Sequence, residues 1–222
     1  MDQLTLVIPA KNEEETLPTV LKDLEKYNLK ITIVLEENDI KTIEAIKSFD
    51  CKIIFQNGNG YGDALIQGIN SVETKYFCIF NADGSFLSSE LIEMYEKIKI
   101  ENTDYVFGSR YMENGFSEDD TVVTLVGNKI FSLLGKIFFS LSISDILYTY
   151  VIGDTQKTKN LNLQEKDFAF CVELPIKANR SGHKLISSAS YEKPRLAGKK
   201  KVNAIKDGLM ILISMLKLFF KK

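Results

Sequence analysis

The first 110 residues alternate between short apolar runs and amphipathic stretches, and this alternation limits the possible folds more than any other feature of the chain. The apolar runs, each typical of a buried strand, cover residues 4–8, 31–35, 51–55, 76–80 and 105–107. The stretches between them, with apolar residues at helical spacing, cover 17–24, 42–49, 61–71 and 87–100. Short apolar strands joined by helices are typical of a parallel sheet covered on both faces. We therefore predict an α/β fold with a mostly parallel sheet.

Beyond residue 111 the alternation stops and longer helices follow. A stripe of apolar residues predicts a helix over 125–143, a second helix that begins near Phe168 is expected within 161–179, and residues 184–191 are expected to form a strand. The 222 residues are 45% hydrophobic and 26% charged, a globular composition with enough apolar residues for one core. The three cysteines stand far apart in apolar stretches, which favours a reducing cytoplasm over a disulfide framework. Polar residues from Asp2 onward argue against a signal peptide.

The net charge of −2 argues against a general nucleic-acid binder, although positive charge gathers at the C-terminus. Seven lysines stand there against one acid: Lys199, Lys200, Lys201, Lys206, Lys217, Lys221 and Lys222. Residues 202–220 predict an amphipathic helix with Asn203, Asp207, Ser214, Lys217 and Lys221 on its polar side. Its apolar run, 208–220, is shorter than the roughly 20 residues that span a bilayer. The pattern favours a helix lying on a membrane surface with anionic headgroups. The alternative is a helix packed on the protein's own core or in a homodimer.

Polar loops follow several of the predicted strands. Residues 9–12, 36–37 and 108–110 each come directly after one of them. In a parallel sheet these loops meet at one edge, where ligands of such proteins bind. Residues 57–62, Asn-Gly-Asn-Gly-Tyr-Gly, join a strand to a helix and resemble a phosphate-binding loop. No Gly-Lys-Ser or Gly-Lys-Thr follows, so a tight turn explains the glycines equally well.

The stretch FNADGSF, residues 80–86, places the carboxylate of Asp83 where a strand ends. One interpretation is a turn or a helix cap, in which Asp and Asn are frequent. The other is a ligand for Mg²⁺ or Mn²⁺, which commonly bind one or two carboxylates plus substrate phosphates. Arg110 also follows a strand, and it suits either bidentate contact with a diphosphate or a surface ion pair.

Several motifs in a fixed order add a family resemblance to these patterns. They are VIPAKNEEETL at 7–17, GNGYGDALIQG at 58–68, FNADGSF at 80–86, GSRY at 108–111, GNKIFSLL at 127–134, SD at 144–145, FAFCVELPIKANRSG at 168–182 and PRLAGKKKVNAIKDGLMIL at 194–212. In their order and spacing the chain resembles the family 2 glycosyltransferases of GT-A fold, a Rossmann-like α/β fold. Within that family it resembles the dolichol-phosphate mannose synthase-like, polyprenyl-phosphate branch. The match covers residues 4–212.

The resemblance implies a set of site residues. It implies donor contacts from Pro9, Ala10, Asn12, Glu13, Glu36, Gly60, Asp63, Asn81 and Ala82. The implied catalytic residues are Asp83, Arg110 and Asp145, with Asp83 and Asn81 holding Mg²⁺ or Mn²⁺. Lys129, Arg195, Lys199, Lys200 and Lys201 match positions near phosphates of the acceptor or donor. Inverting relatives place a base near Asp145, but a phosphate acceptor is already nucleophilic, so positioning would carry more of the rate.

The chain departs from the family pattern at four places. Asn81 stands where the family usually has Asp, and Ser85 where it often has Gln. Residues 35–38, Leu-Glu-Glu-Asn, replace the usual Asp-Asp-Gly-Ser, and Thr149 with Tyr150 replaces a Ser-Gly pair. An Asn carbonyl can still bind a cation, but with one negative charge fewer the metal affinity should be weaker.

We expect residues 1–200 to form the GT-A domain, with 1–111 binding the nucleotide sugar and 112–200 the acceptor, followed by a basic membrane-surface helix over 201–222. The expected activity is transfer of a sugar, with inversion, from a GDP- or UDP-sugar to a polyprenyl or dolichyl phosphate. The expected location is the cytoplasmic face of a membrane, with the protein bound peripherally. One alternative is a saccharide acceptor in envelope polysaccharide synthesis. Another, suggested by Asn81, is a catalytically silent module that binds nucleotide sugars.

Overall fold

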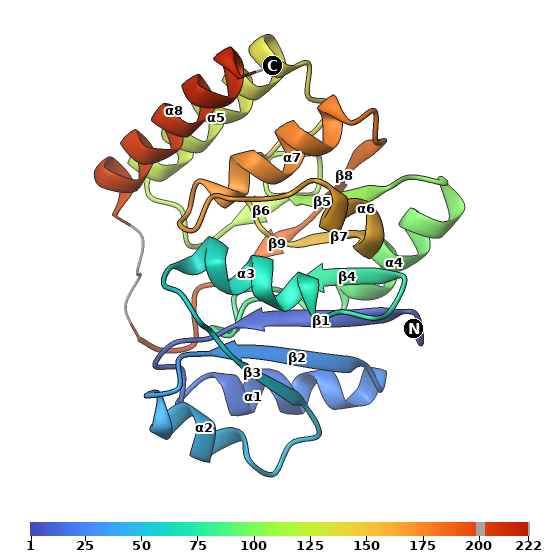
Figure 1. The fold of residues 1–222 in the computed structure, drawn as a ribbon, viewed down its shortest axis with the longest axis vertical. Helices are drawn as coiled ribbons and strands as arrows, with labels where there is room; N and C mark the ends of the chain where they lie inside the picture. The colour runs from blue at the N-terminus through green and yellow to red at the C-terminus, as the bar shows by residue number, and fades with distance from the viewer. Residues whose placement is uncertain (199–202, 222) are drawn as a thin grey trace.

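The computed structural model describes residues 1–198 and 203–221 and arranges them around a seven-stranded sheet (Figure 1). The order is β3-β2-β1-β4-β7-β5-β8, and a small second sheet pairs β6 with β9. The strands are β1 (Leu4–Pro9), β2 (Lys30–Leu35), β3 (Lys52–Phe55), β4 (Tyr76–Ile79), β5 (Tyr105–Ser109), β6 (Phe116–Ser117), β7 (Val151–Asp154), β8 (Leu185–Ala189) and β9 (Tyr191–Glu192). All neighbours in the large sheet except those of β7 are parallel, so the predicted mostly parallel α/β fold is confirmed.

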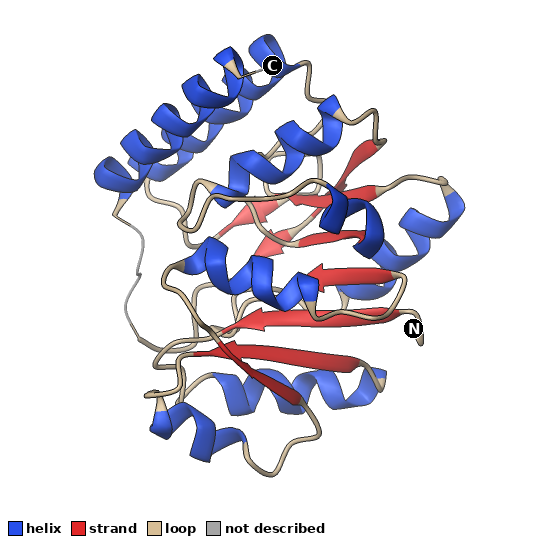
Figure 2. Ribbon diagram, in the orientation of Figure 1, coloured by secondary structure: helices blue, strands red, loops and turns tan. Residues whose placement is uncertain are grey.

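Helices cover both faces of the large sheet (Figure 2). They are α1 (Leu17–Leu24), the short 3₁₀ turn η1 (Glu25–Tyr27), α2 (Ile40–Ile46), α3 (Tyr61–Asn70), α4 (Glu90–Ile100), α5 (Val122–Phe139), α6 (Thr155–Asn160), α7 (Phe170–Arg180) and α8 (Ala204–Phe220). Side chains of a strand alternate between faces, so β1 serves two cores. Leu6 and Ile8 pack with the apolar residues of α1 and α4, whereas Val7 packs with those of α3 and α7.

Strand β7 was not predicted, and it lies antiparallel between β4 and β5. Only Val151 and Ile152 of its four residues are large and apolar, and Gly153 and Asp154 interrupt the pattern of a buried strand. Gly153 lies where the rings of Tyr105 and Phe77 cross the strand, and a Cβ there would come within 2.6 Å and 2.8 Å of their carbons. Glycine therefore lets the two rings pack directly on the backbone of β7.

The long helices differ from prediction at their ends. Helix α5 starts three residues earlier than expected because Thr121 and Thr124 form a reciprocal cap, and it ends at Phe139 because Ser140 turns left-handed at φ 55°. The helix expected within 161–179 begins only at Phe170, and the short α6 precedes it.

The C-terminal helix α8 lies beside α5 and α7 (Figure 1). Ile211, Met215 and Leu218 are buried against the body of the protein. Ser214, which the sequence pattern placed on a solvent-facing polar side, is buried with them and donates a hydrogen bond to Glu165 at 2.8 Å. That placement was wrong, because one edge of α8 packs on the protein's own core. The side predicted to be apolar remains exposed.

The glycine-rich loop before α3 contacts a neighbouring loop. The backbone N–H of Asp63 donates to the carbonyl of Lys166 at 3.0 Å. Gly60, with φ +101°, lies so close that a Cβ would come 2.2 Å from the same oxygen, and a Cβ on Gly62 would come 2.3 Å from the carbonyl of Glu165. The close backbone approach that the glycines allow is therefore used between two loops of the chain.

We predict that Gly62→Ala lowers the free energy of unfolding by about 2–3 kcal/mol, because the new methyl group meets fixed backbone carbonyls. Gly127→Ala is the matched control, since it also lies in a helix but nothing lies within 4 Å of its added Cβ. It should stabilise by about 0.5–1 kcal/mol through helix propensity. Urea unfolding curves measure the free energy of unfolding of both variants. Equal effects of the two substitutions would show that the contact of Gly62 with the neighbouring loop is loose.

Candidate active site

A cavity of about 460 Å³ opens beyond the carboxyl ends of β1, β2 and β4. Most of the residues predicted to form a site line it: Pro9, Ala10, Glu13, Glu36, Gly60, Asn81, Ala82, Asp83, Arg110 and Arg195. The sequence argument that polar loops meet at one edge therefore describes the structure correctly.

Four predicted site residues do not line the cavity. Asn12 adopts a left-handed φ of 51° and donates its backbone N–H to Asp39. Asp63 is buried below the cavity and accepts hydrogen bonds from two glutamine side chains. Lys129 is exposed on α5, and Asp145 lies fully buried behind Arg110. Lys199, Lys200 and Lys201 lie outside the described residues.

The carboxylate of Asp83 sits in the turn after β4 and uses both of its oxygens. Its Oδ1 accepts the backbone N–H of Ser85 at 3.0 Å and the Ser85 hydroxyl at 2.7 Å. Its Oδ2 accepts a hydrogen bond from Nη2 of Arg195 at 2.9 Å. The turn interpretation of Asp83 thus holds for one oxygen, while the other faces a cation in the cavity wall.

The segment 193–198, which we call the strap, lies across the Asp83 turn. The backbone N–H of Lys193 donates to the carbonyl of Ser85, and that of Leu196 to the carbonyl of Asp83, both at 2.9 Å. These two bonds flank Arg195 and point its guanidinium at Asp83. The Nε of Arg195 is buried and has no hydrogen-bond partner among the described residues. An unpaired buried donor of a charged group suits an anion that enters the cavity.

The Asp83 turn fits a divalent cation in part. A cation, the Arg195 guanidinium, already lies against the carboxylate. Asn81 donates its amide nitrogen to Ser85 at 3.3 Å, which leaves its carbonyl oxygen as a ligand for a hard metal ion. No group of three or more His, Cys, Asp or Glu side chains within 1–198 and 203–221 could hold a metal alone. Metal binding at Asp83 would therefore depend on oxygens of the diphosphate.

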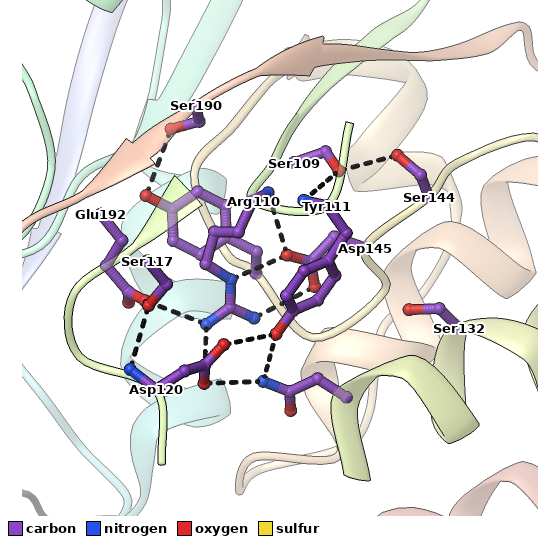
Figure 3. A network of polar contacts seen from close by, with 12 residues as sticks. Ser109, Arg110, Tyr111, Ser117, Asp120, Ser132, Ser144, Asp145, Ser190 and Glu192 are labelled. Atoms are coloured by element: carbon purple, nitrogen blue, oxygen red, sulfur yellow. Dashed lines mark hydrogen bonds and ion pairs between the residues drawn. The ribbon is translucent and has the colours of Figure 1, made fainter. Parts of the chain in front are cut away.

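Arg110, at the end of β5, is the centre of a buried polar network (Figure 3). Its Nε and Nη2 donate to the two oxygens of Asp145 at 2.8 Å and 3.1 Å. Its Nη1 donates to Glu192 at 3.1 Å and lies 3.9 Å from Asp120, and its guanidinium stacks on the ring of Tyr148. The surface ion pair considered from the sequence is thus a buried one.

Burial and charge oppose each other within this network. Burial disfavours the charge of Arg110, but the carboxylates of Asp145 and Glu192 outweigh that effect and raise the pKa of Arg110 well above its usual range. Burial raises the pKa of the Glu192 carboxyl. The charge of Arg110 and the hydrogen bonds from Ser117 and Arg110 lower it again, but only in part. Asp145 is fully buried and bidentately held, so its geometry suits positioning of Arg110 better than contact with a substrate.

Several cavity residues were missed in the sequence. They include Glu192, Asp119, Asp120, Asn128, Tyr148, Phe168, Cys171 and Ile211. All of them lie beyond residue 111, where the strand–helix alternation had ended. Asn128, Phe168, Cys171 and Ile211 fall within the quoted motifs, but the resemblance assigned them no role. The acidic pair 119–120, between β6 and α5, was a further visible signal. Burial raises the pKa of the Cys171 thiol to about 12, so it is not a reactive nucleophile.

A polar cavity beyond the carboxyl ends of a mostly parallel sheet is the arrangement of nucleotide-binding α/β proteins. The model of the family "Glycosyl transferase family 2" matches residues 5–161, which is most of the chain. The chain therefore belongs to glycosyl transferase family 2, and it is a glycosyltransferase.

Individual relatives agree with this assignment. An uncharacterized glycosyltransferase of Mycobacterium tuberculosis is 25% identical over 213 residues, 96% of this chain and 95% of that protein. The 4,4'-diaponeurosporenoate glycosyltransferase of Staphylococcus aureus is 25% identical over 147 residues, 59% of this chain and 39% of that protein.

Solved structures show the same fold. Glucosyl-3-phosphoglycerate synthase of M. tuberculosis, in complex with Mn²⁺, UDP and glucosyl-3-phosphoglycerate, has a TM-score of 0.73 at 11% identity, covering 97% of this chain and 79% of that one. Mannosyl-3-phosphoglycerate synthase of Rubrobacter xylanophilus has a TM-score of 0.71 at 14% identity, covering 97% and 72%. The expected GT-A fold is confirmed.

We predict that Arg110→Gln lowers the free energy of unfolding by about 3–5 kcal/mol at pH 7, because Asp145 is left buried without its counter-ion. Burial raises the pKa of the Glu192 carboxyl, and Arg110 opposes that effect in the wild type, so the deficit should shrink as the pH falls to 5 and Glu192 takes up a proton. Glu44→Gln breaks an exposed ion pair with Lys47 and should leave stability unchanged. Denaturation curves of the wild type and both variants at pH 7 and pH 5 measure the free energy of unfolding. A loss of stability in Arg110→Gln that does not vary with pH would contradict the buried-charge explanation.

Proposed function

We propose that this protein transfers one sugar, with inversion, from a GDP- or UDP-sugar to a polyprenyl or dolichyl phosphate at the cytoplasmic surface of a membrane. One observation supports the lipid acceptor: the cavity wall includes residues from the first halves of α5 and α8, the two helices with apolar outer faces. Thr124 and Asn128 come from α5, and Ala204 and Ile211 from α8. A lipid phosphate held at that surface could enter the cavity between these helices while its hydrocarbon stays in the membrane.

The outer faces of α5 and α8, which we call the apolar face, are large and continuous. Each of their apolar side chains is at least 37% exposed: Val122, Val123, Val126, Ile130, Leu133, Ile137, Phe138, Ile205, Leu209, Leu212, Ile213, Leu216, Phe219 and Phe220. The two helices touch through Phe138 and Phe219, whose rings cross at 5.7 Å. Contiguous apolar patches of this kind mark protein or membrane contacts in soluble proteins.

Charge on the apolar face favours lipid as its partner. Five exposed lysines stand on or beside the two helices: Lys129, Lys136, Lys206, Lys217 and Lys221. The acid Asp207 is the one carboxylate in the two helices. Apolar side chains with lysines around them suit a helix pair at the interface of an anionic membrane.

Length and composition alone would also let one helix within the described residues, α5, cross a membrane. Its inner edge, however, buries Ser132, Gly135 and Phe139 against the protein. We therefore propose that α5 lies along the surface next to α8.

The donor side of the cavity would hold the nucleotide sugar. Ala10 and Glu36, after β1 and β2, face the space expected for the nucleoside, and Arg195 with its unpaired Nε would bind the diphosphate. A Mg²⁺ or Mn²⁺ ion at Asp83, as the Mn²⁺-containing neighbours suggest, would supply charge neutralisation of the leaving diphosphate.

In the reaction, a phosphate oxygen of the lipid attacks the anomeric carbon from the face opposite the diphosphate. The new carbon–oxygen bond forms as the bond to the diphosphate breaks, and the nucleoside diphosphate leaves with that electron pair. Phosphate is ionised at neutral pH, so this step needs no strong base, and Asp145 would act by holding Arg110 in place.

The assay that tests the proposal uses purified protein, labelled GDP- and UDP-sugars, Mn²⁺ and a short polyprenyl phosphate. We predict that the labelled product extracts into organic solvent. Asp83→Asn should lower the rate of product formation by about 100-fold or more, because it removes the carboxylate that faces the diphosphate. Asp2→Ala should keep full activity, because Asp2 is an exposed acid that precedes β1, at the end of the strand away from the cavity.

Other outcomes separate the alternatives. Water-soluble labelled product with phosphoglycerate, the acceptor of the structural neighbours, or with saccharides would replace the lipid acceptor. Binding of nucleotide sugar without turnover would favour a silent module. Equal activity of Asp83→Asn and the wild type would contradict the assigned donor site.

A flotation experiment tests the apolar face. We predict that the wild type floats with vesicles of phosphatidylcholine and phosphatidylglycerol, and that Leu209→Glu/Leu216→Glu does not, because two charges enter the exposed side of α8. Ile100→Glu, at an exposed apolar position on α4, is the matched control and should float. Flotation of the double variant like the wild type would show that lipid contacts another surface.

A further inference from the structure

We propose that Arg195 is the resident counter-ion of Asp83 in the ligand-free protein, and that a divalent cation takes its place there only together with a nucleoside diphosphate. The inference rests on the proposed use of a nucleotide sugar and a metal. It adds that the protein binds the metal poorly by itself, because the chain supplies its own cation at the metal position.

The geometry of the strap holds Arg195 at that position. Its guanidinium contacts Oδ2 of Asp83 at 2.9 Å and lies 3.9 Å from Oε1 of Glu13, so it sits between two carboxylates of the cavity wall. The flanking backbone bonds from Lys193 and Leu196 fix the strap on the Asp83 turn. The pair is therefore built into the fold of the strap and is more than a chance contact of two long side chains.

Gly84 allows a second close contact between the strap and the Asp83 turn. Its φ of +79° is a left-handed conformation, and a Cβ there would come 2.5 Å from Cδ1 of Leu196. Glycine at position 84 therefore lets Leu196 lie directly on the turn that carries Asp83. Both members of the pair are held by neighbouring backbone, which reduces the entropy that forming the ion pair would otherwise cost.

Charge balance explains why a metal alone would not displace Arg195. Asn81 is neutral, so the turn itself offers the single carboxylate of Asp83, which Arg195 neutralises, while Glu13 adds one further negative charge beside the guanidinium. A divalent cation entering this pair would add two positive charges, and Glu13 balances only one of them. A nucleoside diphosphate brings that negative charge, and it offers oxygens both to the metal and to the guanidinium.

The unpaired Nε of Arg195 can donate a hydrogen bond to a ligand in the cavity. It is buried, lacks a hydrogen-bond partner among the described residues, and belongs to a residue that lines the cavity. A diphosphate oxygen would satisfy this donor while Nη2 leaves Asp83. The same arginine would thus exclude metal from the empty site and bind the donor in the filled one.

The test measures Mn²⁺ binding by the loss of the electron paramagnetic resonance signal of free Mn²⁺, with no nucleotide or acceptor present. We expect weak binding by the wild type and binding tighter by about tenfold or more in Arg195→Gln, because the competing charge is gone. With UDP or GDP added, the order should reverse, and Arg195→Gln should bind nucleotide more weakly than the wild type.

Three control variants sharpen the result. Arg195→Lys keeps a cation and should bind Mn²⁺ alone as weakly as the wild type. Arg195→Gln/Asp83→Asn should lose the added affinity, which would place the ion at Asp83. Arg180→Gln removes an exposed arginine on α7 that does not line the cavity; it donates to the carbonyl of Lys221 and lies over the ring of Phe139. This variant should match the wild type.

The proposal is overturned if Arg195→Gln binds Mn²⁺ alone no better than the wild type, including the case in which neither binds. Because this arm contains neither sugar nor acceptor, its outcome is independent of the glycolipid assay. A protein that fails to make glycolipid can still show the gain of Mn²⁺ affinity, and a protein that makes glycolipid can still lack it.

Discussion

The buried pair between Arg110 and Asp145 is the interaction on which the cavity depends. Arg110 ends β5, Asp145 stands in the loop before β7, and Glu192 joins them from β9. Through Asp120 the same guanidinium reaches the segment that leads into α5. One cation thus ties together parts of the chain that form one wall of the cavity, and desolvation makes each partner costly to remove.

This wall and the Asp83 turn give the cavity two different sides. The donor side is built from polar loops after β1, β2 and β4, with Asp83 and Arg195 at its corner. The other side includes the stacked rings of Tyr61 and Phe168 and, from α8, the apolar Ile211. The polar corner suits the proposed diphosphate, and the cavity-lining residues of α5 and α8, whose outer faces are apolar, suit the proposed lipid acceptor.

The sequence predicted the elements that have a clear period, including β8 and the long C-terminal helices, and missed the short strands β6, β7 and β9. Strands β1 to β5 and their helices stand out because each is a buried run of a recognisable period. Strand β7 has no such signal, since its place depends on the rings of Tyr105 and Phe77 that close over Gly153. Ser214 was misplaced because helical periodicity cannot tell which edge of α8 meets the core.

The sequence likewise predicted the individual residues of the candidate site but not how they pair. Asp83 and Arg195 were found from motifs, but their pairing joins residues 112 positions apart and could not be read from either motif. The chemistry assigned to both still rests on one arrangement, with a metal and a diphosphate at the Asp83 turn. A crystal structure with Mn²⁺ and GDP or UDP measures this most directly. We predict the ion between Asp83 and the diphosphate, and Arg195 moved onto the diphosphate oxygens. An ion bound elsewhere, with Arg195 still paired to Asp83, would contradict the central claim.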